Sequence, residues 1–515
     1  MTEKGDGPQP TVKKVLQALD LGSAVAEHDQ LLKEHFVETS VFRQVVEDRV
    51  DVVAGDKGTG KTAIFLVLSE RYATYEALHD VEVVPAFNPA GQPIFQRLLD
   101  TETMDEAQYV AVWKVYFLSL AGNWVLNFFD EDLSSDMRRL DELLRSADLR
   151  SADETPETIF GKLIARVKKQ FARVTGFEGT ASATAEGIPI LTGRFLFDSD
   201  DSDAESKGKS GTDTVRPDDA LALLQRILAD NGFKIWLVVD RLDEAFQGKP
   251  TIERPALRAL LRTYLDMLAF PNVRLKLFIR RDLLARITVG GSGGFVNLTH
   301  INARKVEITW DDEDLKDLLD RRLRASGQFV DMLDAETDSS DALFQLVFPD
   351  QVDPGTRKPK TWAWILTRIR DANGVKPPRN LIDLALKAQE QQFKREERSP
   401  RTYTPRKEPL ITSDALKKGL QALSEQRVLD TLLAEAGEDA VLIEPFRNGK
   451  SEHNKETLAE LLGENSVKKV EVLKTLGFLE PIGANFKIPM LYRGGLGITQ
   501  GKAFSGEPDD DEDDE

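Results

Sequence analysis

The sequence predicts an α/β fold in which a parallel β-sheet is flanked by helices. The sequence contains several short apolar runs, each of strand length. Longer segments with apolar residues at helical spacing lie between these runs, such as 109–129 and 251–269. Strands that alternate with helices in this way form parallel sheets that are covered on both faces. The predicted strands are short runs rich in apolar and β-branched residues, at 50–54, 81–87, 233–239, 273–279 and 305–309.

Composition sets broad limits on the kind of protein. The chain has 515 residues, 41% of them hydrophobic and 30% charged, which is typical of a globular protein with several domains. We expect no contact with a membrane, because no uncharged apolar run reaches about 18 residues. The absence of cysteine fits a cytoplasmic protein. The net charge of -19 disfavours non-specific binding to nucleic acid over the whole surface.

One motif organises the chain and predicts a nucleotide site. The sequence between the first strand and the next helix fits G-x-x-x-x-G-K-S/T, the phosphate-binding loop of nucleoside triphosphatases. Backbone N–H groups of such a loop, together with the positive end of the helix dipole, attract a phosphate. Lys61 would reach the β and γ phosphates, and the Thr62 hydroxyl would ligate Mg²⁺. The predicted nucleotide-binding residues are Gly55, Asp56, Lys57, Gly58, Thr59, Gly60, Lys61, Thr62 and Ala63.

A second, acidic motif follows the strongest predicted strand. The run that ends at Val239 continues into Asp240-Arg241-Leu242-Asp243-Glu244. An acid at this place would position Mg²⁺, and a nearby carboxylate would polarise the attacking water. We expect Asp240 to serve the metal and Glu244 to act as the base, with Asp243 as the alternative base. The other interpretation is that these acids cap the next helix, a role that suits Asp243.

In these motifs the chain resembles bacterial ATPases of the AAA+/STAND type. It is most similar to stand-alone ATPases related to origin-recognition and KAP-type proteins, several of which are linked to anti-phage defence. The resemblance covers about 40–90 and 230–310 clearly, and 360–500 more weakly. It implies that ATP and Mg²⁺ are the ligands. In such families an arginine after a later strand senses the γ-phosphate, which here falls on Arg280, with Arg281 beside it.

The resemblance also implies a second sensor in a helical lid. The stretch 374–382 is similar to the usual Pro-Arg motif of such lids, and Arg379 is its arginine. The planar fork of arginine suits phosphate oxygens. Two departures weaken the match. Arg241 follows Asp240 where AAA+ proteins usually have glutamate, so slow hydrolysis is expected. A long insertion also separates Thr62 from Asp240.

These observations predict an order of domains. The first is an N-terminal extension with lead-in helices, and the last residues, which are mostly acidic, are predicted to be disordered. The predicted segments are an extension at 1–40, a P-loop ATPase core at 41–310 with an insertion at about 100–225, a helical lid at 311–392, a basic linker at 393–409, a winged-helix-like domain at 410–500 and a disordered acidic tail at 501–515.

Three functions stay open at this point. The favoured one is a nucleotide-driven switch, in which ATP binding and slow hydrolysis control self-assembly or a protein effector. The alternative is a DNA-associated ATPase that uses the winged helix on duplex DNA. A small-molecule kinase shares the phosphate loop but fits the size and layout of the chain less well.

Overall fold

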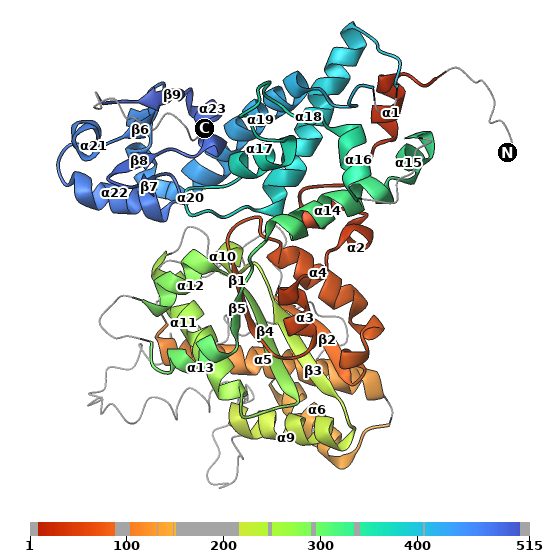
Figure 1. Ribbon diagram of the computed structural model, residues 1–515. Coiled ribbons are helices and arrows are strands. Elements are labelled where there is room, and N and C mark those ends of the chain that lie inside the picture. The colour runs from red at the N-terminus through yellow and green to blue at the C-terminus, as the bar shows by residue number, and fades with distance from the viewer. Residues whose placement is uncertain are drawn as a thin grey trace, which may run out of the picture. The chain divides into compact units, whose positions relative to one another are not determined.

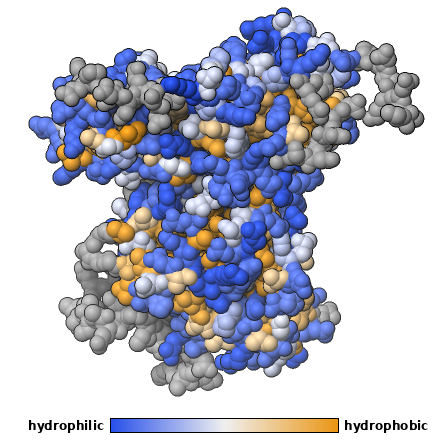
Figure 2. Space-filling view, viewed as in Figure 1, coloured by the Kyte–Doolittle hydropathy of each residue, from blue (hydrophilic) through white to orange (hydrophobic). Residues whose placement is uncertain are grey.

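The computed structural model describes most of the chain, and Figure 1 shows its helices and strands. Most of the predicted insertion and most of the predicted acidic tail lie outside the described residues. Hydrophilic residues dominate the face that Figure 2 shows. The described residues are 9–87, 104–130, 132–147, 149–150, 216–245, 250–289, 295–333, 340–404 and 407–504.

The chain packs into two compact units. One, the sheet unit, consists of Ser40–Gly55 and Ile64–Ile308. The other, the helical unit, consists of Met1–Thr39, Asp56–Ala63 and Thr309–Glu515, so it contains the predicted phosphate loop. The predicted boundaries between lid, linker and winged helix stay predictions.

The sheet unit contains the predicted parallel sheet. Every neighbouring pair of its five strands is parallel, and the order across the sheet is β2-β3-β4-β1-β5. The first strand of the chain therefore lies between the fourth and the fifth. The strands are β1 (Val52–Gly55), β2 (Val81–Phe87), β3 (Lys234–Val239), β4 (Val273–Arg280) and β5 (Lys305–Glu307).

Helices cover both faces of this sheet, as the sequence predicts. Side chains of β4 alternate between the faces. Leu275 and Leu277 join one large buried cluster with helices α5, α9 and α11, whereas Phe278 meets Phe65 of α4 with 6.4 Å between ring centroids. The helices of this unit are α3 (Ser40–Val46), α4 (Lys61–Arg71), α5 (Glu106–Phe129), α6 (Ser135–Ser146), α9 (Pro217–Asp230), α10 (Leu242–Ala245), α11 (Pro250–Met267), α12 (Arg281–Thr288) and α13 (Leu298–Ala303).

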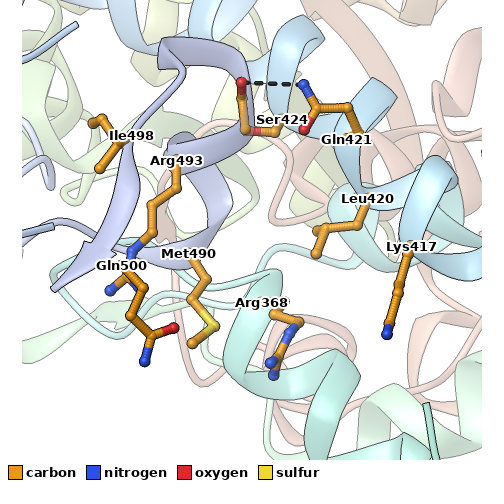
Figure 3. Close-up of a pocket in the computed structure, with 10 residues that line it drawn as sticks. Arg368, Lys417, Leu420, Gln421, Ser424, Met490, Arg493, Ile498 and Gln500 are labelled. Atoms are coloured by element: carbon orange, nitrogen blue, oxygen red, sulfur yellow. Dashed lines mark hydrogen bonds between the residues drawn. The ribbon is translucent and has the colours of Figure 1, made fainter. Parts of the chain in front are cut away.

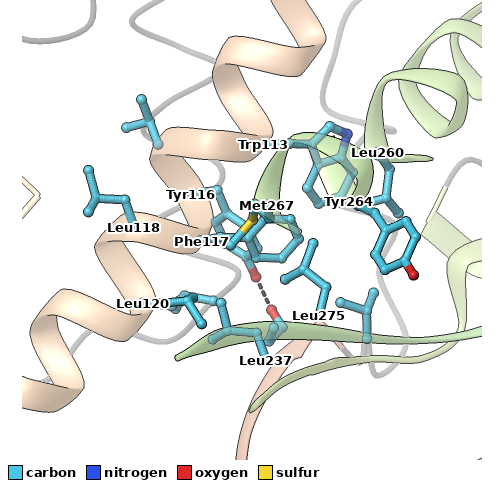
Figure 4. Close-up of a cluster of buried hydrophobic side chains, with 14 of the residues drawn as sticks. Trp113, Tyr116, Phe117, Leu118, Leu120, Leu237, Leu260, Tyr264, Met267 and Leu275 are labelled. Atoms are coloured by element: carbon cyan, nitrogen blue, oxygen red, sulfur yellow. Dashed lines mark hydrogen bonds between the residues drawn. The ribbon is translucent and has the colours of Figure 1, made fainter. Parts of the chain in front are cut away.

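The aromatic stripe of α5 belongs to the core. Trp113, Tyr116 and Phe117 are fully buried, and the rings of Trp113 and Phe117 stack at 5.6 Å (Figure 4). The Tyr116 hydroxyl donates a hydrogen bond to the carbonyl oxygen of Ala86. By length and composition alone α5 could span a membrane, but 78% of its most apolar window is buried inside the protein. It is a core helix.

A buried cluster of charges holds the start of β1. Asp51 is fully buried, and it accepts hydrogen bonds from Lys276 Nζ at 2.9 Å, Tyr264 Oη at 3.1 Å and the Arg304 guanidinium. Lys276 is 1% exposed and lies over the Trp236 ring, 4.0 Å from its centroid. Buried charges are tolerated only when they are paired in this way. The sequence gives no sign of this cluster.

The helical unit is built around a second hydrophobic cluster. The N-terminal helix contributes Val12, Val15 and Leu16 to this cluster, which also holds residues of the long helix α18 and of the C-terminal segments. Residues 393–398, predicted as linker, continue α18 instead. The helices up to this point are α1 (Val12–Ala18), α2 (Leu32–His35), α14 (Asp312–Ala325), α15 (Gly327–Leu333), α16 (Ser340–Val347), α17 (Thr361–Arg368), α18 (Pro378–Arg398) and α19 (Ser413–Arg427).

The C-terminal part of this unit carries a small sheet and short helices. A π-helical turn, Val428–Leu433, follows α19 and leads into α20 (Ala434–Ala436). The polar strands β6 and β9 were not predicted from the sequence. The remaining elements are β6 (Lys450–His453), α21 (Lys455–Leu462), α22 (Ser466–Thr475), β7 (Glu480–Ile482), β8 (Asn485–Lys487), α23 (Met490–Leu496) and β9 (Thr499–Lys502), with sheet order β7-β8-β6-β9.

Candidate nucleotide-binding site

The predicted phosphate loop is a tight turn between β1 and α4. Gly58 and Gly60 have φ angles of 79° and 101°, a region that is open to glycine and strained for other residues. The Thr59 hydroxyl donates to the carbonyl oxygen of Asp56 at 2.8 Å, which closes the turn. Helix α4 begins directly after it at Lys61, and the first N–H groups of a helix have no carbonyl partner within the helix. This is the local geometry that an anion needs.

The lysine of the motif lies over its own loop. Lys61 Nζ donates to the carbonyl oxygen of Asp56 at 2.9 Å, so its charge is held beside the turn. Thr62 and Ala63 follow in the first turn of α4. The hydroxyl of Thr62 and the carboxylate of Asp240 are hard oxygen donors, the type that Mg²⁺ prefers. Their chemistry fits the predicted metal.

Two residues of the helical unit contact Gly58 and Thr59 of the phosphate loop. Trp310 Nε1 donates to the carbonyl oxygen of Thr59 at 2.8 Å. The backbone N–H of Arg379, near the start of α18, points to the carbonyl oxygen of Gly58 at 3.5 Å. A Cβ atom on Gly58 would lie 3.1 Å from Cβ of Arg379. The predicted sensor arginine therefore lies directly against the predicted phosphate loop.

A third contact reaches the π-helical turn. Lys57 Nζ donates to the main-chain carbonyl oxygen of Asp430 at 2.7 Å. The Asp430 carboxylate accepts from Arg427 Nη1 at 2.7 Å, and Arg427 Nε donates to Oδ1 of Asn380 at 2.7 Å. Arg427 also pairs with Asp383 of α18. The loop, α18 and the end of α19 are thus joined by one hydrogen-bonded network.

The acidic motif lies at the end of β3. Asp240 directly follows the strand and is 1% exposed. Arg241 has a left-handed backbone with φ 57°, which is uncommon for a residue other than glycine. Asp243 and Glu244 follow in the short helix α10, where Arg241 Nη1 lies 3.6 Å from Glu244 Oε2. The predicted base therefore carries its own cationic partner.

Arg280 ends β4 in the middle of the sheet. Its Cα partner across the ladder is Gly55, the last residue of β1. Its guanidinium lies 3.6 Å from Asp243 and donates from Nε to Asp282 at 2.9 Å. Burial alone would raise the pKa of Asp282, but the Arg280 charge and hydrogen bond lower it below its ordinary value. The next residue, Arg281, extends to Glu307 at 4.0 Å.

The strand order gathers these predicted residues at one edge. β3, β4 and β1 are neighbours and parallel, so their carboxyl ends meet at the same side of the sheet, where open α/β sheets bind ligands. Asp240, Arg280 and Gly55 stand at these three ends. Among the described residues, no group of three or more His, Asp and Glu is close enough to hold a metal ion. Magnesium in phosphoryl-transfer sites needs no such group, because phosphates and waters complete its shell.

Comparison with known proteins finds two solved structures of interest. The chain is similar to the Walker-type ATPase PABY2304 of Pyrococcus abyssi, with 11% identity and a TM-score of 0.37, over 93% of this chain and 99% of that chain. It is also similar to the Aeropyrum pernix ORC1 protein, solved in complex with DNA, with 15% identity and a TM-score of 0.25, over 70% and 91% of the two chains. No protein-family model and no curated protein matches the sequence. Likeness at these scores supports no inference about this chain.

The fold class itself follows from the chain's own structure. A parallel sheet with helices on both faces, joined from β1 to α4 by the glycine turn, is the arrangement of a P-loop NTPase. The predicted fold class is confirmed to that extent.

One carboxylate near this edge was missed by the sequence prediction. Glu253 in the first turn of α11 has a side chain that is 19% exposed, and it pairs with Arg286 at 3.2 Å. Burial raises the pKa of Glu253; among its charged neighbours Arg286 and Arg280 oppose this, and Asp282 and Asp243 add to it. A carboxyl group with a raised pKa among other acids is a candidate proton acceptor. Nothing in the sequence separates it from an ordinary surface glutamate of a helix.

Proposed function

We propose that the protein is a P-loop ATPase of the AAA+ type that binds ATP with Mg²⁺, hydrolyses it slowly and acts as a nucleotide-dependent switch. The observation that carries this proposal is the glycine turn between β1 and α4, with Arg379 packed on Gly58. When a loop binds phosphate and also contacts the lid, a change in the loop on phosphate binding can change the position of the lid.

Each predicted residue has a part in this proposal. The loop N–H groups and Lys61 would hold the β and γ phosphates, and Thr62 and Asp240 would hold or orient Mg²⁺. Arg280 and Arg379 would stabilise charge on the γ-phosphate from the sheet and from the lid. Bound Mg²⁺ would supply charge neutralisation at the phosphates.

The surroundings of Glu244 support the proposal of slow hydrolysis. A general base works best when its carboxylate is free to accept a proton at the operating pH. Glu244 lies 3.6 Å from Arg241, so its carboxylate would have to leave this ion pair to orient the attacking water. A base held in an ion pair favours long-lived ATP binding over fast turnover, as a switch requires.

The output of the switch is proposed to pass through α18 and α19. Lys57, Asp430, Arg427 and Asp383 form a continuous path from the phosphate loop to both helices. A change in the loop on nucleotide binding would alter these contacts and with them the C-terminal part of the unit. We propose a homo-oligomer or a protein effector as the partner, and, from the resemblance alone, anti-phage defence as the setting.

The test combines binding, turnover and assembly. Lys61→Ala should abolish ATP binding in calorimetry, whereas Lys474→Ala, a surface lysine paired with Glu471, should bind like the wild type. Glu244→Gln should bind ATP yet release no phosphate. Light scattering after size exclusion should show larger particles with ATP. Unchanged ATP affinity in Lys61→Ala would refute the site.

A second candidate is a DNA-associated ATPase, and one observation favours it. Helices α21 and α22 are joined by three residues that include Gly463 and Asn465, both with positive φ, and the β7–β8 hairpin follows. This is the order of a helix-turn-helix with a wing. Val467 and Lys468 are exposed at the start of α22. If duplex DNA stimulates phosphate release and the Lys468→Glu variant loses this stimulation, the DNA-associated function is favoured over the switch.

A further inference from the structure

A second pocket lies apart from the phosphate loop, within the helical unit. It is a cavity of ≈ 270 Å³ lined by residues of α17, α19 and α23 and of the segment that enters β9 (Figure 3). Its volume is near the lower end of small-molecule sites, about 300–1,000 Å³. None of the predicted nucleotide-site residues lines it. Its polar lining residues are Arg368, Lys417, Gln421, Ser424, Arg493 and Gln500.

The lining carries more positive than negative charge. Arg368, Lys417 and Arg493 come from three different helices and face one cavity. Asp353 is the acid that pairs with Lys417, at 2.5 Å, and it also accepts from Trp364 Nε1 at 2.9 Å. Arg368 and Arg493 bring two guanidinium groups to the same pocket, beside the ammonium group of Lys417.

The two guanidinium groups are held in place before any ligand binds. Arg368 stacks on the Trp364 ring, 4.3 Å from its centroid, and donates from Nη1 to the Trp364 carbonyl oxygen at 3.2 Å. Arg493 is 8% exposed and donates from Nε to the carbonyl oxygen of Ile488 at 2.8 Å. Burial lowers the pKa of Arg368 to about 10; Asp353 opposes this shift and the Arg493 charge adds to it. Two arginines that repel each other across a cavity are both stabilised when an anion lies between them.

We propose that this pocket binds the phosphate group of a small phosphorylated organic molecule. Guanidinium groups match phosphate oxygens with two parallel hydrogen bonds, and Lys417 adds a point charge. The Gln421 amide at the rim is held by donating to Glu425 at 2.8 Å and to the Gly494 carbonyl oxygen at 3.1 Å. In Figure 3 the nitrogen ends of Arg368, Lys417 and Gln500 point to the same side of the pocket. Its apolar wall, formed by Leu420, Met490 and Ile498, suits an organic group beside the phosphate.

The experiment titrates phenyl phosphate into the full-length Lys61→Ala variant, in which the phosphate loop cannot contribute. Isothermal calorimetry should show saturable binding. Arg368→Gln and Lys417→Gln should each weaken it roughly tenfold or more, as expected for a lost hydrogen bond to a charged group. Lys418→Gln is the matched control, because Lys418 lies next to Lys417 on α19 but outside the pocket, paired with Asp414 at 2.9 Å. It should bind like the parent.

Three results would overturn the proposal. The first is no binding of phenyl phosphate to the Lys61→Ala protein. The second is equal affinity in Lys417→Gln and Lys418→Gln, a comparison of two exposed side chains that stays informative if Arg368→Gln fails to fold. The third is that a duplex oligonucleotide binds in an Arg368-dependent manner while phenyl phosphate does not, which would assign the pocket to nucleic-acid phosphates. Since Lys61 is absent throughout, none of these results bears on the proposed ATP site.

Discussion

Lys57 of the phosphate loop and Asp430 of the π-helical turn are joined by a hydrogen bond of 2.7 Å between Nζ and the main-chain carbonyl oxygen, across 373 positions of sequence. A π-helical turn shifts the helix hydrogen-bond pattern, and such turns are frequent at functional sites. Here the turn presents a carbonyl oxygen to a loop side chain. This hydrogen bond connects the phosphate loop directly to the segment that follows α19.

Replacing Lys57 should loosen that segment. In Lys57→Met we expect faster amide hydrogen exchange over 428–433 and a loss of about 1.5 kcal/mol in the free energy of unfolding, because a hydrogen bond to a charged group is removed. Lys418→Met, which breaks only an exposed i,i+4 pair, should cost less than about 0.5 kcal/mol. Equal urea midpoints for the two variants would show that the contact contributes nothing.

The role of Gly58 in the phosphate loop can be tested by comparing ATP binding in Gly58→Ala and Gly374→Ala. Both glycines have similar positive φ angles, 79° and 76°, so each alanine pays a backbone cost of about 1–2 kcal/mol. A Cβ on Gly374 meets nothing within 4 Å, whereas on Gly58 it meets Arg379 at 3.1 Å. We expect calorimetry to show ATP binding in Gly374→Ala and its loss in Gly58→Ala. Retained affinity in Gly58→Ala would separate the loop from the nucleotide.

Much of this arrangement follows from local sequence, and the rest depends on contacts between distant residues. Strand β3 was predictable because its apolar run is continuous and of strand length, and β4 because its apolar residues alternate with Arg274 and Lys276 over the same length. The polar strands β6 and β9, with sequences KSEH and TQGK, have no hydrophobic pattern, and pairing alone makes them strands. Burial of Lys276 inside β4 and the position of Glu253 are set by tertiary packing, which no local spacing encodes.

Arg280 and its neighbour Arg281 allow the sensor assignment to be tested. Arg280→Gln removes the charge that faces Asp243 and Asp282 at the end of β4, and we expect ATP binding to persist while phosphate release falls at least tenfold. Arg281→Gln removes a long contact of 4.0 Å with Glu307 and should leave phosphate release near the wild-type rate. If the two variants hydrolyse ATP equally, the sensor lies elsewhere.

The buried charge cluster predicts a dependence of stability on pH. Burial alone would raise the pKa of Asp51, but hydrogen bonds and charges from Arg304 and Lys276 hold it below its ordinary value. A carboxyl whose pKa is lower in the folded state stabilises the fold above the unfolded-state pKa, near 3.9, and this contribution is lost as the pH falls through the folded-state value. The contribution of the Asp51 cluster to the stability of the fold should therefore decrease in acid.

Asp51→Asn tests this dependence directly. At pH 7 the variant leaves the Lys276 ammonium buried with less compensation, so we expect a loss of about 3–5 kcal/mol in urea denaturation. Asp48→Asn, whose side chain is 33% exposed, should cost less, because water can replace its contact with Lys276. The difference in stability between wild type and Asp51→Asn should begin to narrow below about pH 4, where the unfolded wild type takes up a proton. It should close below the folded-state pKa, where the folded carboxylate is protonated too. A gap that stays constant from pH 7 to the acid limit would mean that Asp51 is not ionised in the folded protein.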